Sequence, residues 1–238
     1  MIIPNEKTYV EEMLLSKQKP NNVSVKGLIR YIAKYYYDFC QAKEMDLNQY
    51  TKFVLEVVNH FKISKMEYQE YRYAKYTKTY CRNIITGIFS HELREVDKIY
   101  FTKDELDIVN SAVYRKERKV LFTLYAFAKI YSPDTGWINN RESDIFAAAN
   151  VSVSYKERIQ ILHSLFKDDL IGINHMIDKS GYHVTLYPDS PIVYTTNNLT
   201  DFGNQYIVFM DKNLRMCSMC GRIFKPRENQ KCCNKCSQ

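Results

Sequence analysis

Two Cys-x-x-Cys pairs near the end of the chain constrain it more than any other feature. Twelve residues separate the two pairs. Four thiols at this spacing predict one tetrahedral metal site, because each pair sits on a tight turn that aims both sulfurs at one ion. Gly221 directly follows the first pair, where such a turn often needs a positive φ. The predicted ligands are Cys217, Cys220, Cys233 and Cys236.

A fifth cysteine in this region makes the third ligand a choice. Cys233 and Cys236 repeat the two-residue spacing of the first pair, whereas Cys232 and Cys236 would leave three residues between the ligands. We therefore predict Cys233 as the ligand and Cys232 as a hydrophobic filler or a fallback ligand. Disulfides are less favoured, because nothing in the chain marks secretion. Four thiolates accept zinc or iron, so both metals stay open.

The stretch from Cys217 to Cys236 resembles the small zinc-ribbon modules of bacterial and phage proteins. The resemblance rests on Cys-x-x-Cys-Gly-x-x-Phe, a short polar turn and the second Cys-x-x-Cys pair. Relatives often carry an aromatic residue where this chain has Cys232. The resemblance implies a structural Zn²⁺ ion and no catalytic residue, and it covers only the C-terminal end of the chain.

The N-terminal half predicts a bundle of helices. Pro and Gly number only 6 and 7 in 238 residues, which favours helical structure. Apolar residues recur at helical spacing over 25–43, 48–61 and 64–89. In the third of these segments lysines and arginines alternate with tyrosines, a mixture that could bind nucleic acid but is more often the packing face of a bundle. Cys40 and Cys81 lie in these patterns and are predicted to be buried and inert.

Residues 118–187 show a different order of elements. Asn150 is predicted to end one helix, and Ser152 or Ser154 to cap the next, while Thr102 and Glu105 have capping-box spacing ahead of an earlier helix. The predicted elements are a helix over 120–131, a strand at 137–138, helices over 141–149 and 155–169, and a hairpin over 170–187. The helix over 155–169 is predicted to bury Ile159, Leu162, Leu165 and Phe166.

This order resembles the winged-helix domains of bacterial regulators and replication initiators. In that family the helix before the hairpin usually enters the major groove of double-stranded DNA. The resemblance implies contacts from the start of the helix and from the tip of the hairpin, and the basic ribbon could add phosphate contacts. The implied nucleic-acid-binding residues are Ser154, Tyr155, Lys156, Arg158, Gln160, Lys179, Arg222, Lys225 and Arg227.

The charge distribution along the chain supports the implied DNA binding only in part. The chain has a net charge of +7, but residues 119–212 carry eight basic and ten acidic side chains, whereas residues 213–238 carry six basic and one acidic. A protein that binds double-stranded DNA usually contacts several phosphates with Lys or Arg. Winged helices also serve as protein-interaction modules, so a protein partner is the alternative.

The predicted fold is therefore mainly α with α+β parts. It comprises a helical domain over 1–117, a winged-helix-like domain over 118–190, a β connector over 191–212 and a zinc ribbon over 213–238. The connector is predicted from two β-like runs, 192–196 and 205–210. The N-terminal bundle is expected to mediate assembly, as a homo-oligomer or with another protein.

No catalytic pattern is present in the sequence. His91-Glu-Leu-Arg-Glu95 lacks the second histidine of a zinc-protease helix, and no glycine-rich phosphate loop occurs. Long apolar runs and a signal peptide are also missing, so we expect a cytoplasmic protein with no membrane segment. The expected function is non-enzymatic DNA binding of regulator or replication-accessory type, from a phage or mobile element. The alternative is an adaptor or inhibitor that binds host machinery.

Overall fold

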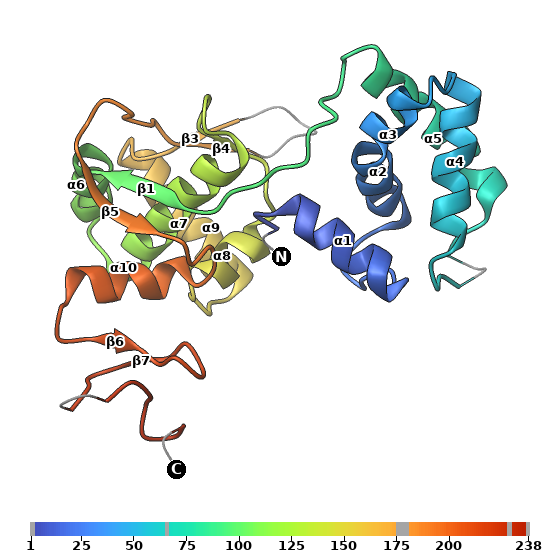
Figure 1. Ribbon diagram of the computed structural model, residues 1–238. Helices are drawn as coiled ribbons and strands as arrows, with labels where there is room; N and C mark the ends of the chain where they lie inside the picture. The colour runs from blue at the N-terminus through green and yellow to red at the C-terminus, as the bar shows by residue number, and fades with distance from the viewer. Residues whose placement is uncertain (1–2, 65–66, 175–180, 228–229, 237–238) are drawn as a thin grey trace. The chain divides into compact units, whose positions relative to one another are not determined.

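Helices form most of the regular structure in the computed structural model, which describes residues 3–64, 67–174, 181–227 and 230–236 (Figure 1). The helices are α1 (Glu6–Ser16), α2 (Val25–Tyr35), α3 (Tyr37–Ala42), α4 (Leu47–Asn59), α5 (Glu70–Ile85), α6 (Lys103–Ser111), α7 (Arg115–Tyr131), α8 (Glu142–Ala148), α9 (Tyr155–Lys167) and α10 (Phe202–Met210). The strands are β1 (Ile99–Thr102), β2 (Trp137–Ile138), β3 (Gly172–Ile173), β4 (Tyr182–His183), β5 (Ile192–Thr196), β6 (Arg215–Met216) and β7 (Ile223–Phe224). The predicted class, mainly α with α+β parts, is confirmed.

The chain divides into two compact units, residues 3–96 and the residues from 97 onwards. The predicted boundary between residues 117 and 118 lies inside helix α7. The finer division of the second unit into winged-helix-like, connector and ribbon domains stays a prediction.

Helices α2, α4 and α5 form the centre of the first unit, where α4 packs on both of the others. Local signals fix where these helices begin: Ser24 Oγ accepts from the N–H of Gly27, and Asp46 and Gln49 form a capping box. The apolar faces between the helices bury a common core. Its members include Leu28, Ile29, Ile32, Tyr50, Val54, Val58, Cys81 and Ile84.

The helix predicted over 25–43 is two helices, because Tyr36 leaves helical geometry at φ −96° and ψ 6°. Its ring packs edge-on against Phe53 of α4, with the ring centres 5.2 Å apart. Tertiary packing has therefore overridden a continuous periodic pattern. The helix predicted over 64–89 is shorter, Glu70–Ile85, and helix α1 had no counterpart among the predictions.

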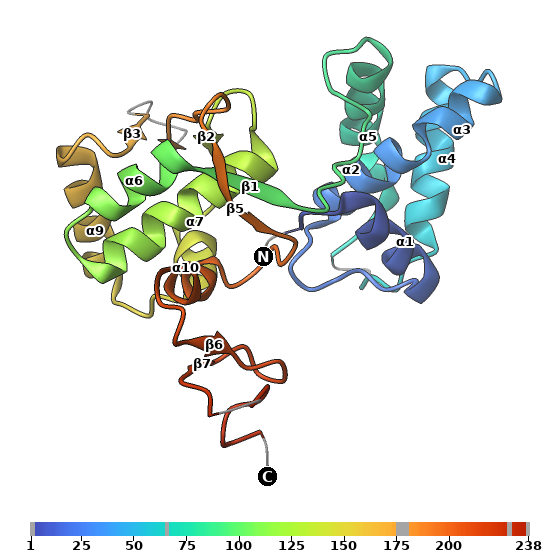
Figure 2. The same cartoon turned by 60° about the vertical axis from the view of Figure 1, so that its left-hand side comes forward.

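Helix α7 is the core of the second unit and is buried on all sides from Val120 to Ala128. Helices α6, α8, α9 and α10 pack around it, as does β1. Strands β1 and β5 pair antiparallel and lie side by side in Figures 1 and 2. Phe101 of β1 stacks on Phe122 of α7 at 4.1 Å, which joins this strand pair to the central helix.

A small antiparallel sheet has the strand order β2-β4-β3. Its strands are separated along the chain by α8 and α9, so helix α7, β2, α8, α9, β3 and β4 follow the predicted order. The predicted hairpin turn at 178–181 falls mostly on residues outside the described ranges. Gly136 turns the chain into β2 with φ +69°, and a Cβ atom there would lie 2.1 Å from the carbonyl oxygen of Val184.

Capping predictions in this unit are confirmed. Ser154 Oγ accepts from the N–H of Glu157 at the start of α9. Asn150 follows α8 in the left-handed region with φ 50°. At the start of α6, Glu105 accepts from the N–H of Thr102 at 2.9 Å, which is one half of the expected capping box.

The strand predicted over 205–210 is wrong, because these residues belong to helix α10. The run Tyr-Ile-Val-Phe has the composition of a strand, but α7 offers an apolar surface that a helix covers better with Phe202, Tyr206 and Ile207. Helix α10 also lies close to the end of α8, and this approach depends on Gly203, whose added Cβ would lie 1.8 Å from the carbonyl oxygen of Ala149.

Helix α9 buries a different set of residues from the predicted one. Leu162 and Leu165 are buried as expected, together with Ile161. Ile159 and Phe166 are exposed instead, at 41% and 36%. The packed stripe of α9 is therefore rotated from the predicted one, which leaves two apolar side chains on the solvent-facing side.

Candidate metal centre and nucleic-acid interface

Strands β6 and β7 form a two-stranded antiparallel ribbon that positions the first cysteine pair. The N–H of Cys217 donates to Arg222 O at 2.8 Å, and the N–H of Gly221 donates to Cys217 O at 2.9 Å. Gly221 has φ +68°, so the positive φ expected from the sequence is present. The second pair turns similarly, since the N–H of Cys236 donates to Cys233 O at 2.9 Å.

The two turns bring four thiols together. The Sγ atoms of Cys217, Cys220, Cys233 and Cys236 all lie within 4.8 Å of one another. Those of Cys220 and Cys233 are 3.7 Å apart. A disulfide needs about 2.05 Å, whereas tetrahedral Zn–S bonds of about 2.3 Å place sulfur atoms roughly 3.8 Å apart. The cluster therefore has the donor set of a four-thiolate metal site, and its Cys220–Cys233 distance matches the tetrahedral value.

A backbone donor supports one of these sulfurs. The N–H of Cys233 donates to Cys217 Sγ at 3.3 Å, and this bond is the main cause that lowers the pKa of the Cys217 thiol to about 6. Metal binding requires the thiolate, so this contact favours the ligating form. Cys232 points elsewhere: its Sγ lies 3.2 Å from Ser218 Oγ. The structure thus gathers Cys233, and not Cys232, with the other three.

The ribbon contacts helix α10 and carries a basic surface. Asn204 Nδ2 donates to Gly221 O at 3.5 Å, which links α10 to the first cysteine turn. The predicted contact residues Arg222, Lys225 and Arg227 are all exposed. Within the cysteine cluster, Cys217 and Cys233 are buried.

Helix α9 presents most of its predicted contact residues to solvent. Ser154, Tyr155, Lys156 and Gln160 are exposed. Glu157 is half-buried and binds Lys116 with an N–O distance of 2.6 Å, so its charge is compensated on the side toward α7. The exposed face of this helix therefore carries no uncompensated carboxylate between residues 155 and 167.

Two predicted contact residues are placed differently. Arg158 is half-buried, its guanidinium lies 5.7 Å from the ring centre of Phe146, and its Nε is buried with no hydrogen-bond partner among the described residues. This arrangement makes Arg158 a packing residue of the α8–α9 contact as well as a charge. Lys179 lies outside the described residues.

His163 and Lys167 are exposed on α9 and were not predicted. They follow Lys156 and Gln160 at i+3 or i+4 spacing, so the four side chains share one face. That spacing is readable in the sequence once the buried stripe is known to be Ile161, Leu162 and Leu165.

The buried thiols of the first unit match their predicted role. Cys40 and Cys81 are fully buried. Burial raises the pKa of Cys40 to about 11 and that of Cys81 to about 12. Neither thiol is suited to nucleophilic or metal chemistry.

Within the described ranges, no helix combines the length and the apolar character that crossing a membrane requires. In comparisons with known proteins, no family profile, no curated protein and no solved structure matches this chain. The site must therefore be interpreted from its own geometry.

Proposed function

We propose that this chain is a non-enzymatic, zinc-containing protein that binds double-stranded DNA, of regulator or replication-accessory type in a phage or mobile element. The observation that carries the proposal is the face of α9, where Lys156, Gln160, His163 and Lys167 are exposed in one row. This row combines side chains that neutralise phosphates with side chains that hydrogen-bond base edges.

The arrangement around α9 supports a winged-helix interpretation. One strand before the helix pair joins the later hairpin, so the sheet order is β2-β4-β3. In winged helices the helix that precedes the hairpin enters the major groove. Here that helix is α9, whose far side packs on α7.

Zinc is the proposed ion because four cysteine thiols gathered in one cluster match the donor set of its preferred structural site. The residues that would hold it are Cys217, Cys220, Cys233 and Cys236. A bound ion would stabilise the short ribbon β6–β7, which has little apolar core of its own. Four protein ligands leave no open position on the metal, so its proposed role is structural.

The basic ribbon side chains extend the proposed DNA surface. Arg222, Lys225 and Arg227 are exposed on the part of the chain with the largest excess of positive charge. Their expected role is to contact phosphates, which adds affinity without sequence preference.

The test is binding of the zinc-loaded full chain to labelled duplex DNA over a salt series. The variant Lys156→Ala with Lys167→Ala should lower the affinity at least several-fold. It should also reduce the slope of log K against log salt by the amount expected for about two phosphate contacts. Lys98→Ala with Lys103→Ala removes the same charge from exposed positions elsewhere in the unit and should bind like the wild type. Absence of salt-dependent binding in the wild type would refute the proposal.

A protein-interaction adaptor or inhibitor is the second candidate. It is favoured by apolar side chains left exposed in the second unit: Ile192 at 59% and Val193 at 45% on β5, and Val113 and Tyr114 at 66% between α6 and α7. Exposed apolar patches of this kind are common at protein interfaces. On this interpretation the chain would not bind duplex DNA, and Ile192→Asp would abolish capture of the protein partner.

A further inference from the structure

We propose that the first unit binds single-stranded nucleic acid on a surface between α2 and α5, separate from the duplex-binding face of the second unit. We call it the α2–α5 surface, and define it by Lys26, Arg30, Lys34, Tyr76, Tyr80 and Phe89.

Helix α2 supplies a row of cations. Lys26, Arg30 and Lys34 follow one another at i, i+4 and i+8, so they lie about 6 Å apart along one side of the helix. The helix contains no acidic residue. Among the described residues none of the three pairs with a carboxylate, although Lys34 donates to the backbone oxygen of Glu92 at 3.0 Å. Charges arranged in this way attract a polyanion.

The arginine of this row is held in place by aromatic rings. Arg30 Nε donates to Tyr76 Oη at 2.6 Å, and its guanidinium carbon lies 5.8 Å from the ring centre of Tyr80. Lys26 Nζ lies 5.3 Å from the ring centre of Tyr76. With Nε engaged, the two terminal nitrogens of Arg30 make no hydrogen bond within the described ranges. A guanidinium fixed in this way loses little entropy when it binds a phosphate.

Helix α5 adds charge on the same flank. Lys75 and Arg82 are exposed and lie on the side of Tyr76 away from the buried stripe of this helix. Glu70 is the single acidic residue of α5, and it accepts from Asn59 Nδ2 at 2.8 Å at the start of the helix. The middle and end of α5 therefore continue the positive surface of α2.

Apolar groups beside the cations favour a single strand over a duplex. Tyr76, Tyr80 and Phe89 form a continuous series of rings, with centres 6.2 Å and 5.2 Å apart. The series ends at Phe89, which is 41% exposed, next to Ile88 at 68%. Tyr80, Ile88 and Phe89 border a hollow of about 390 Å³ that Arg30 and Lys34 also line. An unpaired base can stack on such a ring, whereas a duplex hides its base faces.

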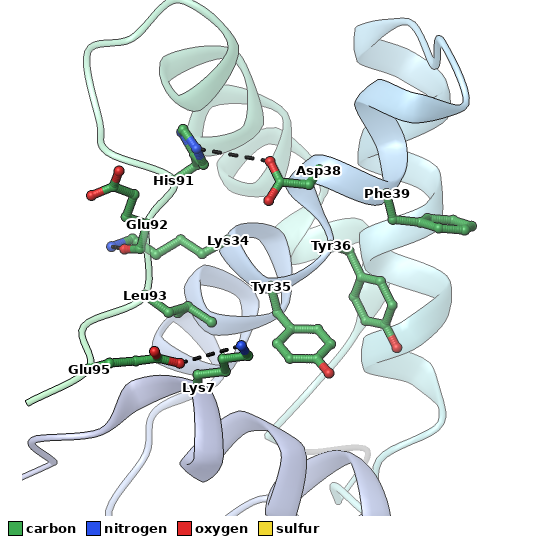
Figure 3. Close-up of a pocket in the computed structure, with 10 residues that line it drawn as sticks. All are labelled: Lys7, Lys34, Tyr35, Tyr36, Asp38, Phe39, His91, Glu92, Leu93 and Glu95. Atoms are coloured by element: carbon green, nitrogen blue, oxygen red, sulfur yellow. Dashed lines mark hydrogen bonds and ion pairs between the residues drawn. The ribbon is translucent and has the colours of Figure 1, made fainter. Parts of the chain in front are cut away.

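Acidic residues mark where the surface stops. Lys34 also borders a second hollow of about 640 Å³, shown in Figure 3, whose rim includes Asp38, Glu92 and Glu95. Two of these carboxylates lie near basic side chains of their own, Asp38 at 4.0 Å from His91 and Glu95 at 3.5 Å from Lys7, and the three together make this rim acidic. A phosphate chain should therefore run from Lys34 toward Lys26 and away from this hollow.

The experiment measures anisotropy of a labelled oligothymidylate of about 20 nucleotides, longer than one such groove covers, with the full chain over a salt series. Lys26→Ala with Arg30→Ala should weaken binding about tenfold and reduce the steepness of log K against log salt by about 1.4, the value for two single-strand phosphate contacts. Phe89→Leu should weaken binding with the salt slope unchanged, because it removes stacking and keeps the charge.

Lys43→Ala with Lys52→Ala is the matched control, since it removes two exposed charges from the same unit. This control, and Lys156→Ala with Lys167→Ala on α9, should retain wild-type affinity for the single strand. Equal loss in the control, or no loss in the Lys26 and Arg30 variant, would overturn the inference. A further outcome would overturn the inference in favour of an acidic protein partner. In that outcome oligoglutamate competes as strongly as the oligonucleotide, and Phe89→Leu does not change the affinity.

Discussion

Lys129 Nζ lies 2.7 Å from Glu105 Oε1, and the Glu105 carboxylate is completely buried. The same carboxylate accepts from the N–H of Thr102 at 2.9 Å and from the N–H of Tyr187 at 3.4 Å. It thus joins the start of α6, the end of α7 and the segment that leaves β4. One ionic residue ties together three parts of the second unit that are distant in sequence.

Replacing Lys129 by Met should destabilise the protein by about 3–5 kcal/mol, because Glu105 would keep a buried charge without its cation. Glu105→Gln should cost less, since Lys129 is 16% exposed and can turn toward water. The double variant should recover part of the loss. Urea unfolding followed by circular dichroism measures all three, and a loss below about 1 kcal/mol for Lys129→Met would contradict the structural role.

Gly203→Ala should destabilise the second unit strongly, because the new Cβ would lie 1.8 Å from the carbonyl oxygen of Ala149. Either α10 moves away from α8 or the methyl group overlaps the backbone. Gly27→Ala is the helical control: its nearest contact is a Val23 methyl at 3.2 Å, and alanine favours a helix by about 1 kcal/mol. Melting temperatures should fall by several degrees for Gly203→Ala and change little for Gly27→Ala. Similar melting temperatures for the two variants would refute the close approach.

Features set by a few adjacent residues could be predicted from the sequence, whereas features set by contacts between distant segments could not. A cap depends on a few adjacent residues, so Asn150 could be predicted to end a helix and Ser152 or Ser154 to begin the next, and the structure selects Ser154. Helix α10 was predicted as a strand because its local composition favours one, and only the surface of α7 makes it a helix. Strands β1 and β5 pair although they lie about ninety residues apart in the sequence, so no local pattern predicts their pairing.

The four-cysteine cluster was the most predictable site, since cysteine spacing within a short segment determines its geometry. Spacing alone also favoured Cys233 over Cys232, and the structure places Cys233 Sγ 3.7 Å from Cys220 Sγ. The proposed contact face of α9 was harder to predict from the sequence, because the residues exposed on a helix depend on which side packs. Ile159 was expected inside and lies outside, which moved His163 and Lys167 into the exposed row.

The seven cysteines should react with a thiol reagent in separate classes. Burial raises the pKa of Cys40 to about 11 and of Cys81 to about 12, so at pH 8 almost no thiolate is present and both should react very slowly in the folded protein. Raising the pH toward 9 should speed their reaction, since the thiolate fraction rises, yet leave it slow. In zinc-loaded protein Cys232 should react first, and a strong chelator should release four more thiols. Rapid reaction of Cys40 or Cys81 in folded protein would contradict their burial.

Removal of the ion should affect the ribbon and leave the helical units folded. The cysteine turns are held by few backbone bonds, whereas α7 and the bundle core bury large apolar surfaces. A chelator should therefore change the amide spectra of residues after Leu214 and leave the far-ultraviolet circular dichroism almost unchanged. Global unfolding on chelation would show that the ion supports much more than the ribbon.

The most direct test of the four-thiolate centre is elemental analysis of protein purified without chelator. The wild type should contain about one zinc ion per chain. Cys217→Ser and Cys233→Ser should each lose most of it, whereas Cys232→Ser should retain it. A wild-type protein without zinc or iron, or a Cys232→Ser variant that loses its metal while Cys233→Ser keeps it, would contradict the proposed centre.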